Sequence, residues 1–279
     1  MPVGLVLEGG GMRGMYTAGV LDAFLDNEIA ADGAVGVSAG ALFGVNFLSR
    51  QRGRVIRYNK RFSGDKNYIG IRPLLREGNI VNTRFAYEEL PQTLDPFDDE
   101  RFQASGVPFF AVISNIITGL PEYVQIHSVF AQRDTLRASG SLPFVSRPVK
   151  IGNAKYLDGG IADSIPFQWM ADQDYDKLIV VLTRDITYRK KPTSRYADLY
   201  KPRYPQFAEL LKTRHTRYNA SLDLLRQWEE AGKVFVIRPS RPIEIDLMER
   251  DPEKLQQIYD LGIRDAAVRM TRLKAYLTK

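Results

Sequence analysis

Two glycine-rich motifs, each set between a short apolar run and a helical pattern, occupy the first forty residues of the chain. GGGMRG at residues 9–14 follows the run 3–7, and GVSAG at residues 36–40 follows the run 34–37. Runs of this length are typical of buried strands, and successive strand-turn-helix units are typical of a parallel sheet covered by helices. The chain is therefore predicted to be an α/β protein in which two glycine-rich turns lie beside each other.

Ser38 lies at the centre of the second motif. The pattern G-x-S-x-G describes a strained strand-to-helix turn that lifts a serine hydroxyl out of the fold, with Gly36 and Gly40 where a Cβ would clash. The same residues could instead form a small-residue turn that packs a helix closely on a sheet. The strand pattern before Ser38 and the apolar segment 39–45 after it favour the first interpretation. A serine at a helix N-terminus, where free N–H groups favour negative charge, is the candidate nucleophile.

The first motif is suited to binding an oxyanion. Gly9, Gly10 and Gly11 leave the backbone free to turn several N–H groups toward one point, as a developing oxyanion requires. Losing one such donor typically costs roughly 3 kcal/mol of transition-state stabilisation. Gly14 supports the turn into the next helix. Arg13 has two interpretations: it positions an anionic phosphate or the loop itself, or it is a solvated arginine at a helix start.

The spacing Gly9-x-Gly11-x-x-Gly14 after a strand also matches a dinucleotide-binding fingerprint. That fingerprint needs an acidic residue about twenty positions on, at the end of the second strand, to bind the ribose hydroxyls. Here the second strand ends in Ser38, and Asp32 precedes the strand, which predicts that Asp32 lies at the opposite edge of the sheet. No Gly-Lys-Ser/Thr follows, which removes the P-loop. A nucleotide-binding module is the weakest of the functions considered.

A third motif, Asp158-Gly159-Gly160, follows the segment 155–157. Together the three motifs resemble the patatin-like phospholipase family, whose members combine a G-G-G-x-R/K-G loop, a G-x-S-x-G turn and a distant D-G-G/A. The segment 137–144 also resembles a family block that ends a helix beside the active site, and the similarity extends from the first residue to about residue 185. Glu8 stands where many members carry aspartate, with little expected consequence because the loop acts through its backbone.

The resemblance implies a three-layer α/β sandwich with a mainly parallel central sheet flanked by helices, with helical additions. It also implies a serine lipid acyl hydrolase that cleaves acyl esters of phospholipids or related lipids. The family pairs its serine with the D-G-G/A aspartate as a dyad, so Asp158 is implied as the partner of Ser38, with Gly159 and Gly160 supporting its turn. A catalytically weak lipid-binding or regulatory protein on the same fold is the alternative.

Two histidines, His127 and His215, are present to complete a Ser-His-Asp triad. His127 sits in the strand-like alternation of 123–127 and is predicted to be structural, whereas His215 lies among basic residues and is predicted to be solvated. The dyad is favoured, and a triad that uses His215 stays open. An aspartate near its usual pKa of about 3.9 is a weak base at neutral pH, so we expect burial to raise the pKa of Asp158.

Composition fits a soluble enzyme. With 279 residues, 44% of them hydrophobic, the chain can bury the core of a full domain. It has no cysteine, which excludes disulfides and thiolate metal sites, and it shows no calcium-binding loop. No signal-peptide pattern precedes the first strand, and the uncharged stretch 34–49 is too short to span a bilayer. The chain is therefore predicted to be cytoplasmic, with neither a metal nor a cofactor.

Positive charge gathers in two segments of a chain with a formal net charge of +6. Six lysines and arginines lie within residues 50–61 with no acidic residue between them. This run fits a solvated helix face or peripheral contact with an anionic membrane surface, and nucleic-acid binding is not expected because no matching motif accompanies the charge. The second segment, 184–217, has tyrosines between its cations, which suits either a membrane interface or ordinary packing.

Further strands are predicted at 107–113, 177–182 and 234–237. We expect a catalytic domain over 1–240 and a helical extension over 241–279, in which Asp251-Pro252-Glu253 has the pattern of a capped helix start. Within the domain, 51–104 is expected to form a cap or wall over the acyl site, and 186–205 a long loop or flap.

Overall fold

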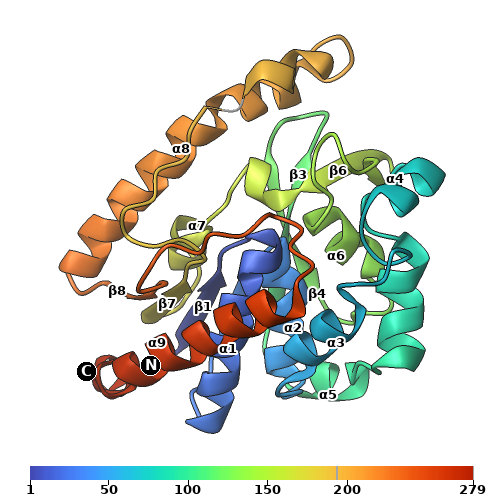
Figure 1. Cartoon of the computed structure of the whole chain (residues 1–279). Helices are drawn as coiled ribbons and strands as arrows, with labels where there is room; N and C mark the ends of the chain where they lie inside the picture. The colour runs from blue at the N-terminus through green and yellow to red at the C-terminus, as the bar shows by residue number, and fades with distance from the viewer. Residues whose placement is uncertain (193, 279) are drawn as a thin grey trace.

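A mixed sheet of eight strands forms the middle layer of the computed structural model, which describes residues 1–192 and 194–278 (Figure 1). The strands are β1 (Val3–Leu7), β2 (Gly33–Val37), β3 (Phe109–Asn115), β4 (Pro121–Ile126), β5 (Val149–Ile151), β6 (Ala154–Asp158), β7 (Lys177–Val181) and β8 (Val234–Ile237). Their order is β5-β6-β3-β2-β1-β7-β8, with β4 also paired to β3. Neighbouring strands are parallel along the series β3-β2-β1-β7-β8. The pairs β3-β4, β3-β6 and β5-β6 are antiparallel. The predicted α/β fold with a central sheet is confirmed.

Parallel pairing brings the ends of three strands together. Leu7 of β1 lies opposite both Gly36 of β2 and Val181 of β7. The glycine loop and the Ser38 turn therefore start at the same edge of the sheet, the carboxyl ends of parallel strands, where ligands bind in open α/β sheets. Asp32 lies at the other end of β1, where its Oδ2 accepts a hydrogen bond from the Val3 N–H at 2.7 Å, as predicted.

Helices cover both faces of the sheet. The first face carries α1 (Gly14–Asp26), α2 (Ala39–Leu48) and α9 (Pro252–Leu277), and the second carries α7 (Phe167–Ala171) and α8 (Pro205–Glu230) (Figure 1). Successive strand residues point to opposite faces, so Leu5 and Leu7 join the core under α1, α2 and α9, whereas Val6 joins the core under α7 and α8. The two apolar cores on either side of one sheet make a three-layer sandwich.

Helix α9 packs along α1 as part of the first flanking layer. It begins as the sequence pattern predicts, because the Asp251 side chain accepts hydrogen bonds from the N–H groups of Glu253 and Lys254, with proline at the start of the helix. Two glycines let the helices approach closely: a Cβ on Gly19 would lie 2.1 Å from the Tyr259 carbonyl oxygen, and one on Gly262 would lie 2.2 Å from that of Tyr16. Residue 279, the last of the predicted extension, lies outside the described residues.

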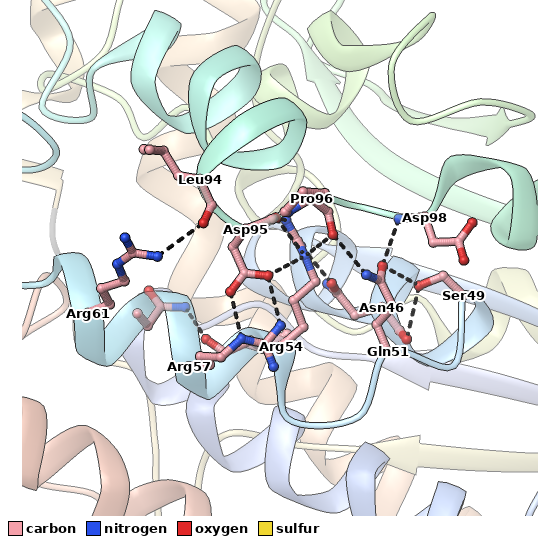
Figure 2. Close-up of polar contacts among 12 residues, drawn as sticks. Asn46, Ser49, Gln51, Arg54, Arg57, Arg61, Leu94, Asp95, Pro96 and Asp98 are labelled. Carbon is pink, nitrogen blue, oxygen red and sulfur yellow. Dashed lines mark hydrogen bonds and ion pairs between the residues drawn. The ribbon is translucent and has the colours of Figure 1, made fainter.

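The segment 51–104 forms helical structure at the edge of the first face. Its elements are α3 (Arg54–Phe62), α4 (Ile71–Glu77), the π-helical η2 (Phe85–Leu94) and α5 (Asp99–Ala104). Arg57 donates to both carboxylate oxygens of Asp95 at 2.8 Å, and Arg54 donates to the Asp95 carbonyl oxygen and to Asn46 Oδ1 (Figure 2). These contacts fasten α3 to the chain that follows η2.

The same contacts revise the interpretation of the basic run at 50–61. The side chain of Arg54 is 5% exposed, and Arg52 pairs with Asp26 of α1. The acidic partners lie outside the run, so a search for charges within it could not find them. Arg52, Arg54 and Arg57 thus pair with acidic residues of the same chain, and contact of the exposed cations with an anionic membrane stays a prediction.

The segment 186–205 connects β7 to α8 and includes the 3-10 helix η4 (Ser194–Leu199). Residue 193 of this predicted loop lies outside the described residues. The backbone of Lys190 is held against α8, because its N–H donates to Asn219 Oδ1 at 2.9 Å and its carbonyl oxygen accepts from Asn219 Nδ2 at 3.1 Å. Across residues 1–192 and 194–278, none of the helices combines the length and apolar character needed to cross a membrane.

Candidate active site

Ser38 occupies the sharp turn between β2 and α2. Its backbone has φ +53° and ψ −121°, a conformation that costs a non-glycine residue free energy and that occurs at nucleophile turns. The N–H of Ser38 donates to Ser139 Oγ at 2.9 Å, from the end of α6 (Arg133–Ser139), within the block 137–144. The Oγ of Ser38 donates to Asp158 Oδ2 at 2.6 Å. Two residues 120 positions apart are thus joined through their side chains.

Asp158 ends β6 and is 2% exposed. Pairing of β6 with β3 fixes its position, because Asp158 lies opposite Ile113. Its second carboxylate oxygen, Oδ1, accepts a hydrogen bond from the Gly160 N–H at 2.8 Å, in the turn η3 (Gly159–Ile161). Burial raises the pKa of Asp158, and the hydrogen bond from Ser38 and the positive charge of Arg214 oppose that rise. A buried carboxylate with a raised pKa is a better acceptor for a serine proton than a solvated one.

The glycine loop lies against the Ser38 turn. Gly11 begins the short helix η1 (Gly11–Arg13) with φ +54°, and a Cβ on it would lie 2.4 Å from the Leu247 carbonyl oxygen. A Cβ on Gly40 would lie 2.4 Å from the Leu7 carbonyl oxygen, so both motifs need glycine for close backbone approach. The N–H groups of Gly10 and Gly11 donate to no other atom of residues 1–192 and 194–278, whereas that of Met12 donates to Leu247. Two unused donors therefore remain beside Ser38.

The remaining motif glycines lie within or beside the turns that carry the candidate site residues. Gly9 faces Ser38, since a Cβ on it would lie 2.9 Å from the Ser38 Cβ. Gly14 starts α1, Gly36 lies in β2, and Gly159 follows the candidate base. Residues of all three predicted motifs meet at one cavity, which is lined by Gly9, Gly10, Gly11, Arg13, Ser38, Asp158 and Gly160.

Glu8 contributes more than the sequence predicts. Its buried carboxylate accepts hydrogen bonds from the Thr183 N–H at 2.6 Å and from the Tyr218 hydroxyl. It therefore ties the start of the glycine loop to the end of β7 and to α8. The sequence-based expectation for Glu8 rested on the backbone of the loop alone. The partners of the Glu8 side chain lie 175 and 210 positions away in the sequence, where a local motif does not reveal them.

An apolar cavity of about 150 Å³ opens on one side of Ser38. The segment 51–104 supplies much of its wall, including Tyr58, Tyr87 and Leu90, and α2 supplies Leu42. Apolar, largely pre-formed cavities of this kind bind apolar parts of small molecules. The cavity suits an acyl chain whose carbonyl reaches Ser38.

A second cavity, of about 140 Å³, opens on the other side of Ser38 and has a different chemistry. Four cationic side chains line it: Arg13, Arg184, Lys190 and Arg214. Sequence reasoning had singled out Arg13 alone. The other three belong to the segment 184–217, for which the sequence favours either a membrane interface or ordinary packing, and they come from the loop after β7 and from α8. The alternation of cations and tyrosines in the sequence was the signal that could have indicated these positions. In the structure Arg184 lies 4.0 Å from the centre of the Tyr188 ring, and Lys190 lies 4.4 Å from that of the Tyr218 ring.

The histidines lie elsewhere. His127 is exposed after β4, and the His215 ring contacts the Lys212 carbonyl and the Thr216 hydroxyl of its own helix. Neither lines a cavity that contains Ser38. In the described ranges, no three acidic or histidine side chains gather as a metal site would require.

Comparison with known proteins gives two matching families and several relatives. A family described as patatin-like phospholipase matches residues 5–170, and a domain of unknown function, DUF6363, matches residues 204–278. The uncharacterized protein YjjU of Escherichia coli is 28% identical over 93% of this chain and 74% of its own length. Lysophospholipase NTE1 of Saccharomyces cerevisiae is 25% identical over 94% of this chain and 16% of its own, and neuropathy target esterase sws of Drosophila melanogaster is 29% identical over 59% and 12%. The chain thus spans a small part of these two named enzymes.

Proposed function

Because the chain belongs to the patatin-like phospholipase family, we propose that it is a serine lipid acyl hydrolase that cleaves acyl esters of phospholipids or related lipids. The observation that carries the proposal is the 2.6 Å contact between Ser38 Oγ and Asp158 Oδ2 at the boundary of two cavities. One cavity is apolar and the other is cationic, which matches the two ends of a phospholipid. The ester bond would lie between them, at Ser38.

In the first step Asp158 accepts the Ser38 proton as Oγ attacks the ester carbonyl carbon. The carbonyl oxygen becomes an oxyanion, and the unused N–H groups of Gly10 and Gly11 are the donors available to stabilise it. Collapse of the tetrahedral intermediate breaks the bond to the leaving alcohol, which takes the proton from Asp158. The acyl group stays on Ser38 as an ester.

In the second step water attacks the acyl-Ser38 ester, and Asp158 accepts a proton from that water. The same N–H donors stabilise the second oxyanion. The proton returns to Ser38 Oγ as the fatty acid leaves. The dyad needs no histidine, and the contacts of His215 within its own helix support that choice over a triad.

Labelling with a fluorophosphonate probe and measurement of intact mass test the proposal directly. We expect a single adduct on the native chain and none on Ser38→Ala. Ser164→Ala is the matched control, because Ser164 lines the same cationic cavity and should leave the adduct intact. Absence of the adduct on folded native protein would contradict the hydrolase and favour the lipid-binding alternative.

Peripheral contact with an anionic membrane belongs to the same proposal. Leu75 of α4, 82% exposed, and Phe144, 48% exposed, are large apolar side chains at the surface, and Leu142, two residues before Phe144, lines both cavities. Ile80, after α4, donates its N–H to the Val145 carbonyl oxygen, which links the two regions. We expect Leu75→Ser to weaken binding to anionic vesicles, and Val268→Ser, on α9 and 83% exposed, to leave it unchanged. Equal effects of the two variants would remove this surface from the proposal.

A further inference from the structure

The cationic cavity gathers four positively charged side chains around two carboxylates, Glu8 and Asp158, so its cations outnumber its anions. Its two carboxylates are already engaged, Glu8 by Thr183 and Tyr218, and Asp158 by Ser38 and Gly160. In the part of the chain that the structure describes, none of the four cations of this cavity forms an ion pair with a carboxylate. Clustered cations that outnumber the nearby carboxylates and form no ion pair with them are unfavourable unless something else compensates them.

The cations of this cavity are also shielded from water. Arg13 Nε is buried without a hydrogen-bond partner among the described residues. Burial and then the charge of Arg214 lower the pKa of Lys190 to about 7, and burial and then Arg184 lower the pKa of Arg13. An anion between these groups would restore both pKa values and supply the missing acceptors. The arrangement is that of a site built for a negatively charged ligand.

Several contacts hold Lys190 in place. The double hydrogen bond of Asn219 to the Lys190 backbone pins this residue to α8, and the Lys190 ammonium lies above the Tyr218 ring. Arg214 lies on the same helix, and its Nε donates to the carbonyl oxygen of Gly160, two residues after the candidate base, at 2.7 Å. These cations are therefore positioned relative to the dyad by α8.

Resting on the proposed function, we infer that this cavity binds the phosphate of a lipid whose headgroup carries no ammonium group, and that Arg184, Lys190 and Arg214 select such lipids over choline lipids. The phosphate of either lipid would be attracted. A quaternary ammonium a few bonds beyond it would lie among cations, where like charges repel. A glycerol headgroup or a bare phosphate adds no positive charge. Arg184, Lys190 and Arg214 all lie beyond residues 5–170, outside the segment that matches the phospholipase family.

The test compares two soluble phospholipids with the same short acyl chains, one with a phosphoglycerol and one with a phosphocholine headgroup. For the native chain we expect the phosphoglycerol lipid to have the higher kcat/KM by about tenfold or more, because the choline ammonium is repelled by the cations, and a factor of ten needs only about 1.4 kcal/mol. The ratio within one variant cancels any change at the dyad itself. Lys190→Gln and Arg184→Gln should each bring the ratio close to one, and Lys190→Arg should retain it. Lys191→Gln is the matched control, since Lys191 is the exposed neighbour outside the cavity.

Three outcomes bear on the inference separately from the hydrolase itself. If the native chain hydrolyses a neutral ester and Ser38→Ala does not, the proposed hydrolase is supported. A native kcat/KM ratio near one for the two headgroups would then overturn the headgroup inference and leave the hydrolase standing. Inorganic phosphate measured by calorimetry needs no turnover, and we expect it to bind the native chain and to bind Lys190→Gln at least several-fold more weakly. Phosphate that binds and inhibits while the headgroup ratio stays near one would show a site for the free anion, and would overturn the assignment to a lipid headgroup.

Discussion

Loss of the Arg54 guanidinium should destabilise the protein far more than loss of Arg57, although both arginines pair with Asp95. The side chain of Arg54 is 5% exposed and that of Arg57 is 57% exposed. In Arg54→Met the aliphatic stem is replaced, but the Asp95 carbonyl oxygen and Asn46 Oδ1 lose their donor inside the protein. Each buried acceptor left unpaired costs about 1–3 kcal/mol, so the expected loss is about 2–6 kcal/mol.

Arg57→Gln removes an exposed partner, and Arg54 remains 3.3 Å from the Asp95 carboxylate. Exposed ion pairs contribute about 0.2–1 kcal/mol, so the expected loss is several-fold smaller. Thermal unfolding followed by circular dichroism separates the two, because for a chain of this size about 1 kcal/mol corresponds to a shift of roughly 2 °C in Tm. Arg54 also lines the apolar cavity, so Arg54→Met should raise KM for long-chain esters. Equal Tm shifts for the two variants would refute the reasoning from burial.

Three further predictions concern the site. Asp158→Asn should lower turnover by about 10²–10⁴-fold, the usual contribution of a general base. The native enzyme should lose activity as the pH falls through the pKa of Asp158, which is raised above the ordinary value of about 3.9. Because the folded state disfavours the charged carboxylate, stability falls as the pH rises through that pKa, so Asp158→Asn should have a higher Tm than the native chain at neutral pH. Gly11→Ala should abolish most turnover because its Cβ would meet the Leu247 carbonyl, whereas Gly152→Ala, with φ +58° and no atom within 4 Å, should lower stability slightly and leave turnover unchanged. His215→Ala should keep turnover within about twofold of native, and a loss as large as that of Ser38→Ala would restore the triad.

Local motifs allowed much of the fold and the position of the candidate nucleophile to be predicted. Ser38 is identifiable because a G-x-S-x-G turn needs a few adjacent residues, and β1 and β2 are readable from runs that are buried on both faces. Asp158 is different, since an Asp-Gly-Gly turn is common and its meaning came from the family resemblance. Its position depends on the pairing of β6 with β3, which no local pattern specifies.

The contacts that sequence reasoning missed join residues far apart in the chain. The basic run looked unpaired because Asp95 lies 38 positions beyond Arg57. The sequence did not assign Lys190 and Arg214 to the site, because their common cavity exists only once α8 lies beside the glycine loop. Tertiary packing decides such cases, and a single sequence carries little record of it.

The close approach of α1 and α9 at Gly19 and Gly262 also affects how the chain is synthesised and folded. α1 ends at Asp26 and α9 starts at Pro252, so one apolar side of α1 has no cover until the last helix has been synthesised. At about 5–20 residues per second, that delay is roughly 10–45 s on the ribosome. Throughout this interval the nascent chain displays Tyr16 and its neighbours to the surrounding solution, which makes it a client for chaperones that shield apolar segments.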